Sequence, residues 1–250
     1  MNPQVMRYAI ISDIHSNLEA LEAVLEEIDR LGVDRVVSLG DLVGYNANPN
    51  ECVRILTERG IPSLMGNHDA AACDLEDPDN FNPMAKTAVL WTRQTLDPRH
   101  RAALREMPEQ LCLNRGIRLA HGSLLHRDHY LTSYGDIMEN LRRMQEAEPR
   151  IRILFFGHTH VQGAFAHDGD APVRVSSPRF SIRDDRLYLV NPGSIGQPRD
   201  RDPRCGFLLY DEEAHTVEFV RLSYDIRACS EKILAAGLPK ELAYRIHAGW

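Results

Sequence analysis

Short apolar runs alternate with helix-like segments at the start of the chain, and this alternation is the feature that most constrains its fold. Apolar runs of the β type lie at 8–11, 35–39 and 61–65. Between them, 17–31 carries its apolar residues at helical spacing, and 49–59 has a proline and an acidic residue in its first turn. The order strand, helix, strand, helix, strand is typical of a layered α/β protein.

Residues 73–110 break this alternation with two predicted helices in a row. Asn82-Pro83 and Asp97-Pro98 each join a capping residue to a proline, the combination that opens a helix at its first turn. We expect this helical insertion to lie over one edge of the sheet.

The rest of the chain mixes strands and helices. A hairpin is expected over 111–120, a helix over 134–147 and a strand over 151–156. β-type runs dominate 161–222, and two helices are expected after them. Because no repeat, low-complexity linker or charge block divides the chain, we expect one α/β domain over 1–250 (α+β in some schemes), with two facing sheets.

The composition excludes several classes of protein. The formal net charge is −7, from 36 acidic and 29 basic residues, so a broad surface that coats nucleic acid is not expected. No apolar run is long enough for a membrane span, and residues 1–11 lack the pattern of a signal peptide. The five cysteines form no close pair, so neither a disulfide framework nor a thiolate zinc site is indicated. These features favour a cytoplasmic protein without a membrane partner.

Five predicted strands end in the same way, with a side chain that can bind a metal, mostly beside a glycine. The endings are Asp13-Ile-His15, Gly40-Asp41, Gly66-Asn67-His68-Asp69, His121-Gly122 and Gly157-His158-Thr-His160. The carboxyl ends of parallel strands open onto one crevice, so residues far apart in sequence meet there. A glycine beside a ligand allows the positive φ or the close backbone approach that a tight turn after a strand needs.

Each ending has an ordinary explanation when it is considered alone. An Asp or Asn after a strand is most often a turn residue that hydrogen-bonds the nearby backbone, and a lone His is most often a surface residue. The two imidazoles of His158-Thr-His160, however, can straddle a pair of ions. Together, the five endings predict a site for hard-to-borderline divalent cations, built on a rigid sheet.

The order D-x-H, G-D, G-N-H-D, H-G and G-H-x-H over residues 1–160 resembles the calcineurin-like metallophosphoesterase superfamily. The stretches 40–45 and 191–200 are similar to a subgroup of small, single-domain bacterial and archaeal members of the phosphodiesterase type. The resemblance implies a four-layer sandwich of two mixed sheets flanked by helices. Ser16, where many members have Gly, and Asn46-Ala-Asn48 depart from the commonest pattern, and neither departure removes a ligand.

The resemblance also implies how two divalent ions are held. One set of ligands is Asp13, His15 and His160, the other is Asn67, His121 and His158, and Asp41 bridges both ions. A bridging position suits a carboxylate, because an imidazole offers one lone pair to one metal. Two carboxylates leave the pair of ions with a net positive charge, which favours a phosphate group. Mn²⁺ is the favoured ion, and iron, Zn²⁺, Co²⁺ or Ni²⁺ would suit the same oxygen and nitrogen ligands.

The mechanism that the resemblance implies is metal-assisted hydrolysis of a phosphoester. Two ions about 3.5–4 Å apart activate a bridging hydroxide and clamp the phosphoryl oxygens during an in-line displacement. The resemblance places His68 where it stabilises the transition state and protonates the leaving oxygen. Asp69 is expected to orient His68.

Tyr45 and Arg199 are further candidates for contacts with the substrate. Arg199 could place its guanidinium fork on a phosphate, or it could form an ion pair with Asp200 that holds its loop. Tyr45 could stack on a base, line the rim of the site, or simply pack.

The predicted function is that of a phosphohydrolase acting on a small phosphodiester or a nucleotide-type phosphoanhydride, including dinucleoside polyphosphates. A different reading is a catalytically weak scaffold of the same fold that binds proteins, but all seven ligands and His68 are intact. A protein phosphatase is disfavoured, because no motif supplies the arginine pair of those relatives. Both a monomer and a homodimer are compatible with the sequence.

Overall fold

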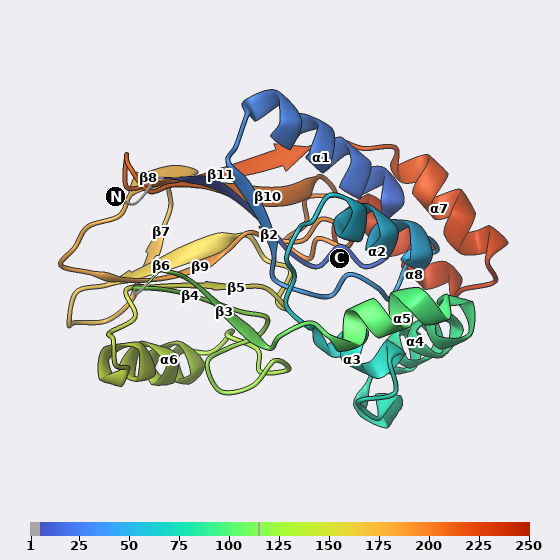
Figure 1. The fold of residues 1–250 in the computed structure, drawn as a ribbon, viewed down its shortest axis with the longest axis horizontal. Helices are drawn as coiled ribbons and strands as arrows, with labels where there is room; N and C mark the ends of the chain where they lie inside the picture. The colour runs from blue at the N-terminus through green and yellow to red at the C-terminus, as the bar shows by residue number, and fades with distance from the viewer. Residues whose placement is uncertain (1–5, 115) are drawn as a thin grey trace.

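The computed structural model describes residues 6–114 and 116–250, whose strands form two facing sheets (Figure 1). In spatial order, the first sheet contains β2 (Arg35–Ser38), β1 (Arg7–Ile11), β10 (Cys205–Asp211), β11 (Thr216–Leu222) and β8 (Arg179–Ser181). The second contains β3 (Gln110–Asn114), β4 (Ile117–Ala120), β5 (Ile153–Phe156), β9 (Leu187–Asn191), β6 (Gly163–His167) and β7 (Val173–Val175). Both sheets mix parallel and antiparallel neighbours.

Helices cover the outer faces of the two sheets and gather at one end of the sandwich (Figure 1). Helix α1 (Leu18–Leu31) lies on the first sheet and α6 (Tyr134–Glu146) on the second, which completes the four layers. The remaining helices are α2 (Pro49–Glu58), α3 (Asn67–Ala72), the short 3₁₀ helix η1 (Pro78–Asn80), α4 (Pro83–Thr95), α5 (Pro98–Arg105), α7 (Ile226–Ala235) and α8 (Lys240–Ala248). In the part of the chain described, none of the helices is both long and apolar enough to cross a bilayer.

The central strands are apolar along their whole length because both of their faces are covered. In β10, Phe207 and Leu209 pack toward α1, whereas Leu208 and Tyr210 face the second sheet. Such continuous apolar runs are typical of strands buried on two sides. The sandwich therefore has one core between the sheets and a further core under each outer helix.

The parallel strands direct their carboxyl ends toward the helical end of the sandwich. β1 runs parallel to β2, with Ile11 opposite Ser38. β4, β5 and β9 also run parallel, with Ala120 opposite Phe156. The turns that follow these strands consequently meet at one end of the molecule, as expected for a doubly covered sheet.

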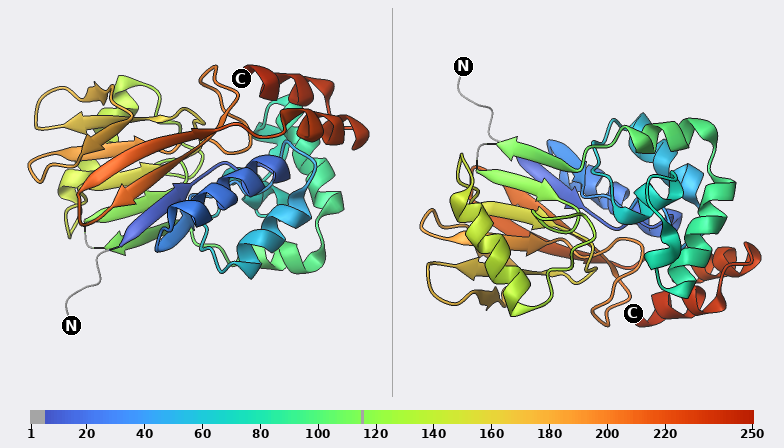
Figure 2. Two further views of the ribbon diagram at one scale, coloured as in Figure 1. Left: turned by 90° about the horizontal axis from the view of Figure 1, so that it is seen from above. Right: turned by 90° about the horizontal axis from the view of Figure 1, so that it is seen from below.

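Two predictions for residues 61–110 are corrected by the structure. The run 61–65 makes only a single bridge, between Ser38 and Ser63, because Pro62 has no N–H to extend a ladder. The two predicted helices, α4 and α5, are present, but they pack on α2 and α3. The inserted segment thus covers the end of the sandwich where the strand-end turns meet, and not a sheet edge (Figure 2).

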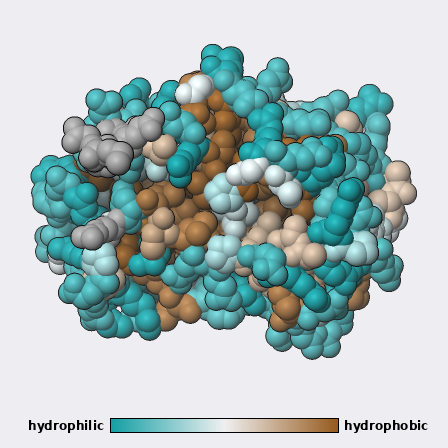
Figure 3. All heavy atoms as spheres, viewed as in Figure 1, coloured by the Kyte–Doolittle hydropathy of each residue, from teal (hydrophilic) through white to brown (hydrophobic). Residues whose placement is uncertain are grey.

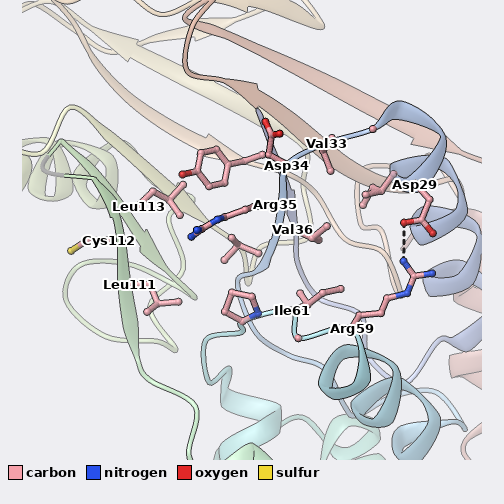
Figure 4. A pocket seen from close by; sticks show the side chains of 16 residues that line it. Asp29, Val33, Asp34, Arg35, Val36, Arg59, Ile61, Leu111, Cys112 and Leu113 are labelled. Carbon is pink, nitrogen blue, oxygen red and sulfur yellow. Dashed lines mark hydrogen bonds and ion pairs between the residues drawn. The ribbon is translucent and has the colours of Figure 1, made fainter. Parts of the chain in front are cut away.

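An apolar groove lies between the edge strands β2 and β3 (Figure 4). Its volume is about 810 Å³, and it is lined by Val36, Ile61, Leu111 and Leu113 among others. It forms part of a hydrophobic band across one face of the molecule (Figure 3). None of the predicted site residues lines this groove, so it is separate from the predicted chemistry.

Phe155 tests the core between the sheets. The side chain is fully buried, and its ring lies 5.6 Å from that of Tyr210 on the opposite sheet. We expect Phe155→Ala to lower the free energy of unfolding by about 3–5 kcal/mol, because a large cavity would remain. Urea denaturation measures the change. Leu234→Ala, at a position 46% exposed on α7, should change it by less than about 0.5 kcal/mol, and similar values for both variants would contradict this packing.

Candidate metal centre

The strand-end turns bring all seven predicted metal ligands to one place. One donor atom from each residue lies within 4.8 Å of the others in two overlapping groups, Asp13, His15, Asp41 and His160, and Asp41, His121 and His158. Asn67 adjoins the second group, with its Oδ1 3.3 Å from His121 Nε2. The structure thus assembles two sets of donors that share a single residue, Asp41.

Asp41 occupies the position between the two sets. Its Oδ2 lies 3.5 Å from His15 Nε2 and 3.3 Å from His121 Nε2. Its Oδ1 accepts a hydrogen bond from the His68 backbone N–H at 2.9 Å. The carboxylate is only 1% exposed, so its contacts are all made within the site.

Four of the imidazoles are fixed by backbone carbonyls on the side away from the donor groups. The contacts are His15 Nδ1 with Val43 O (3.0 Å), His121 Nδ1 with Leu39 O (2.9 Å), His160 Nδ1 with Gln197 O (2.6 Å) and His158 Nε2 with Asp128 O (3.1 Å). A carbonyl only accepts, so the nitrogen that faces it carries the proton. In His15, His158 and His160, which are neutral, the other nitrogen keeps a free lone pair, as in metal-binding histidines, whereas a cation would have to displace the second proton of His121.

The spacing of these lone pairs fits a cation. His15 Nε2 and His160 Nε2 lie 3.1 Å apart, and each ring already has its proton on the opposite nitrogen. Burial lowers the pKa of both rings well below the usual value, and it lowers the pKa of His158 to about 3. Neutral rings with lone pairs directed at one point are stabilised by a positive ion there, so the donor set suits divalent metals.

The buried carboxylates carry the opposite charge. Burial raises the pKa of Asp13 to about 7, although His121 acts against it. Burial also opposes ionisation of Asp41, but the charge and hydrogen bond of His121 hold its pKa well below the usual value. Burial acts to lower the pKa of His121, but the charge and hydrogen bond of Asp41 outweigh it and raise the pKa to about 9. An ionised Asp41 at the centre is the condition that a bridging ligand requires.

Five of the candidate ligands have backbone conformations that non-glycine residues rarely adopt. Positive φ angles occur at Asp13 (53°), His15 (47°), Asp41 (53°), His158 (61°) and His160 (58°). Each costs of the order of 1–3 kcal/mol and persists only where neighbouring structure enforces it, most often at functional sites. Here the turns hold one another, as His15 N–H donates to Asp41 O at 2.9 Å.

The glycines beside the ligands serve mainly for close approach. Gly40 has a positive φ of 104°, but the φ angles of Gly66, Gly122 and Gly157 are ordinary. A Cβ atom on Gly66 would lie 2.0 Å from Asp41 Oδ1, and one on Gly157 would lie 2.1 Å from Ser12 Oγ. Close approach of another segment therefore explains these glycines more often than a positive φ does.

His68 lies beside the donor groups and is almost fully buried. Its ring centroid is 4.5 Å from that of Tyr45 and 4.8 Å from that of Phe81. Its Nδ1 has no hydrogen-bond partner among the described residues, and burial lowers its pKa to about 4. The ring is therefore positioned by aromatic packing and neutral at pH 7 in the unliganded protein.

Asp69 contacts backbone groups and not the His68 ring. Its carboxylate accepts hydrogen bonds from the N–H groups of Val43 and Gly66, both at 3.1 Å. Asp69 is expected to orient His68, but no hydrogen bond joins their side chains among the described residues. Asp69 instead fixes the turn that begins α3 and carries both Asn67 and His68.

Arg199 extends toward the site without a carboxylate partner. Its Nη2 lies 3.2 Å from the Tyr45 hydroxyl and 3.2 Å from Gln197 Oε1, and its buried Nε has no partner among the described residues. The alternative ion pair with Asp200 is not formed, because Asp200 pairs with Arg221. Tyr45 itself is buried and packs on the His15 and His68 rings.

A cavity of about 240 Å³ opens beside the donor groups. Asn67, His68 and His158 line its inner end. Its outer walls include four residues that were not predicted to take part, namely Glu76 and Phe81 of the inserted segment and Asp128 and Tyr130 of the loop after β4. No motif or spacing marks these residues in the sequence, because tertiary contacts bring them to the cavity.

Comparisons with known proteins agree with this fold. The calcineurin-like phosphoesterase superfamily domain matches residues 6–215. An uncharacterised protein of Methanocaldococcus jannaschii is 34% identical over 244 residues, 96% of this chain and 97% of that protein. A metallophosphoesterase from Sphaerobacter thermophilus with a known crystal structure has 34% sequence identity to this chain and a TM-score of 0.81. The match covers 99% of this chain and 100% of that chain. A hypothetical protein from Pyrococcus horikoshii shares the fold, with 21% identity, a TM-score of 0.79 and 98% of each chain covered. The chain thus belongs to the calcineurin-like phosphoesterase superfamily, among its small bacterial and archaeal metallophosphoesterases.

Proposed function

We propose that this phosphoesterase hydrolyses a small phosphodiester or nucleotide-type substrate at a centre of two divalent cations. The observation that carries the proposal is the Asp41 carboxylate, whose Oδ2 lies within 3.5 Å of imidazole nitrogens from both donor groups. One cation is held by Asp13, His15 and His160, the other by Asn67, His121 and His158, with Asp41 shared. Mn²⁺ is the ion that we favour. When bound, such a pair of cations neutralises the phosphoryl oxygens and lowers the pKa of a water molecule.

Arg199 binds a phosphoryl oxygen of the substrate. Its guanidinium is partly buried and has no carboxylate partner, and its Nε has no acceptor in the described part of the chain. A buried cationic donor without an acceptor is costly unless an anion completes its hydrogen bonds. A phosphate oxygen is an acceptor of the required charge.

His68 takes up a proton when the anionic substrate binds beside it, because a nearby negative charge raises its pKa, and it then donates this proton to the leaving oxygen. Its ring lines the cavity next to Asn67 and His158, so it adjoins the space that the departing group must occupy. The packing of Tyr45 and Phe81 against the ring limits its orientations. Asp69 is a positioning residue in this proposal, because it holds the turn that carries His68.

Metal removal tests the activity itself. We expect bis(p-nitrophenyl) phosphate to be hydrolysed in Mn²⁺, and the rate to fall to background in EDTA and to return when Mn²⁺ is restored. Release of p-nitrophenol at 405 nm, roughly the absorption maximum of the product, measures the rate. If no phosphoester is hydrolysed with any divalent metal, the proposal fails and a protein-binding scaffold becomes the better reading.

Gly66→Ala tests the shared carboxylate. The new Cβ would lie 2.0 Å from Asp41 Oδ1, so we expect Asp41 to be displaced and the bound Mn²⁺ to fall by at least one ion per chain. Metal analysis after gel filtration measures the content. Gly135→Ala is the matched control, because its Cβ would meet only Ser133 Oγ, at 3.6 Å. Equal metal content in both variants would contradict a shared position for Asp41.

His68→Ala tests proton donation to the leaving oxygen. An alkyl leaving group needs a proton, whereas p-nitrophenolate departs without one. We therefore expect kcat for an alkyl or nucleoside ester to fall about 10²–10⁴-fold, and kcat for the p-nitrophenyl ester to fall much less. Parallel measurement of both substrates gives the ratio. Equal losses would exclude this role while leaving the metal centre intact.

A further inference from the structure

The cavity beside the donor groups contains features that the proposed function leaves unused. We call it the leaving-group cavity, and it is bounded by His68, Glu76, Phe81, Asp128, Tyr130 and His158. His68 is proposed to protonate the leaving oxygen, so the group attached to that oxygen has to lie in the space that His68 lines. The walls of this cavity therefore select the leaving group and not the phosphate.

Two aromatic rings form parts of the cavity wall. Phe81 packs against His68 with 4.8 Å between ring centroids, and Tyr130 packs against His158 with 3.9 Å between centroids. The two rings come from separate segments, the inserted segment and the loop after β4. A cavity of about 240 Å³ with two aromatic rings in its wall suits a flat ring system, because aromatic faces stack at low entropic cost.

The charged residues of the cavity wall are both acidic. They are Glu76 and Asp128, and the described residues that line the cavity include no Lys or Arg. The guanidinium of Arg127 pairs with Glu76 (3.2 Å) and Glu109 (2.6 Å), and that of Arg199 reaches the cavity only behind Tyr45, with its Nη2 3.2 Å from the Tyr45 hydroxyl. Carboxyl groups accept hydrogen bonds from hydroxyl and amino groups and repel phosphate oxygens.

The backbone holds both acids in place. Arg93 Nη2 donates to the Glu76 carbonyl at 3.0 Å, and the Asp128 carbonyl accepts from His158 Nε2 at 3.1 Å. Burial and the neighbouring Asp128 raise the pKa of Glu76 to about 7. Near neutral pH this carboxyl group can therefore donate a hydrogen bond to a sugar hydroxyl as well as accept one.

We infer, on the basis of the proposed function, that the leaving-group cavity accepts an uncharged group with a flat ring and hydroxyl or amino donors, such as a nucleoside. Glu76 and Asp128 exclude leaving groups that carry phosphate. Within the substrate class proposed above, this favours a phosphodiester that releases a nucleoside over a dinucleoside polyphosphate that releases a nucleotide.

The turnover experiment compares two leaving groups. The substrates are adenylyl-(3′→5′)-adenosine, which releases adenosine, and diadenosine tetraphosphate, which releases a charged nucleotide. We expect the wild-type kcat/KM to favour the diester, and the double variant Glu76→Gln with Asp128→Asn to reduce that preference about tenfold, because the negative charge of the acid pair is removed at nearly constant shape. Asp128→Asn alone should give a smaller reduction in the same direction.

Glu109→Gln is the matched control for the acid pair. Glu109 binds the same Arg127 but its side chain is 70% exposed and lies outside the cavity, so the substrate preference should stay within about twofold of the wild type. A wild type that prefers the tetraphosphate, or a double variant with unchanged preference, would overturn the inference.

A binding experiment separates this inference from the proposed function. Competition between adenosine and adenosine 5′-phosphate is measured by calorimetry in EDTA, where no metal can hold the phosphate. We expect the wild type to bind adenosine more tightly, and the double variant to lose about tenfold of that discrimination. Absence of metal-dependent turnover with normal adenosine binding would reject only the proposed function, whereas turnover without adenosine binding would reject only the cavity assignment.

Discussion

The contact between the Asp41 carboxylate and the two imidazoles on either side of it is the one on which the site depends. One oxygen faces His15 and His121, and the other accepts the His68 backbone N–H. These three residues follow β1, β4 and the segment before α3. A single carboxylate in the turn after β2 therefore contacts turns from both sheets.

The strained turns at the site follow strands that are buried on both faces. Five candidate ligands have positive φ, which together cost of the order of 5–15 kcal/mol. Strands such as β1 and β10 are buried on both faces, and hydrogen bonds join the turns directly, as between Asp13 N–H and Gly40 O at 3.0 Å. Burial of apolar side chains in the strands offsets the free-energy cost of the strained turns.

Local sequence patterns predicted most of the framework, and they marked the strand-end residues whose side chains the structure gathers at one place. Strands buried on two faces leave continuous apolar runs, and Asn82-Pro83 marks the start of α4 as a local signal. The six-residue helix α3 has no such signal, because it is formed by the Asp69 carboxylate capping its first turn from within the site. Glu76 and Tyr130 were not predictable, since distant residues such as Arg93 and His158 place them.

The loop that carries Asp128 and Tyr130 both lines the cavity and anchors the His158 ring, whereas the inserted segment only lines the cavity. The Asp128 carbonyl orients the His158 ring, so any change in the course of this loop also disturbs a candidate metal ligand. Glu76 and Phe81 lie on the other wall, and none of the four anchoring carbonyls belongs to their segment. A change in the inserted segment can thus alter the cavity wall without touching an anchoring carbonyl, whereas a change in the facing loop alters the wall and the orientation of His158 together.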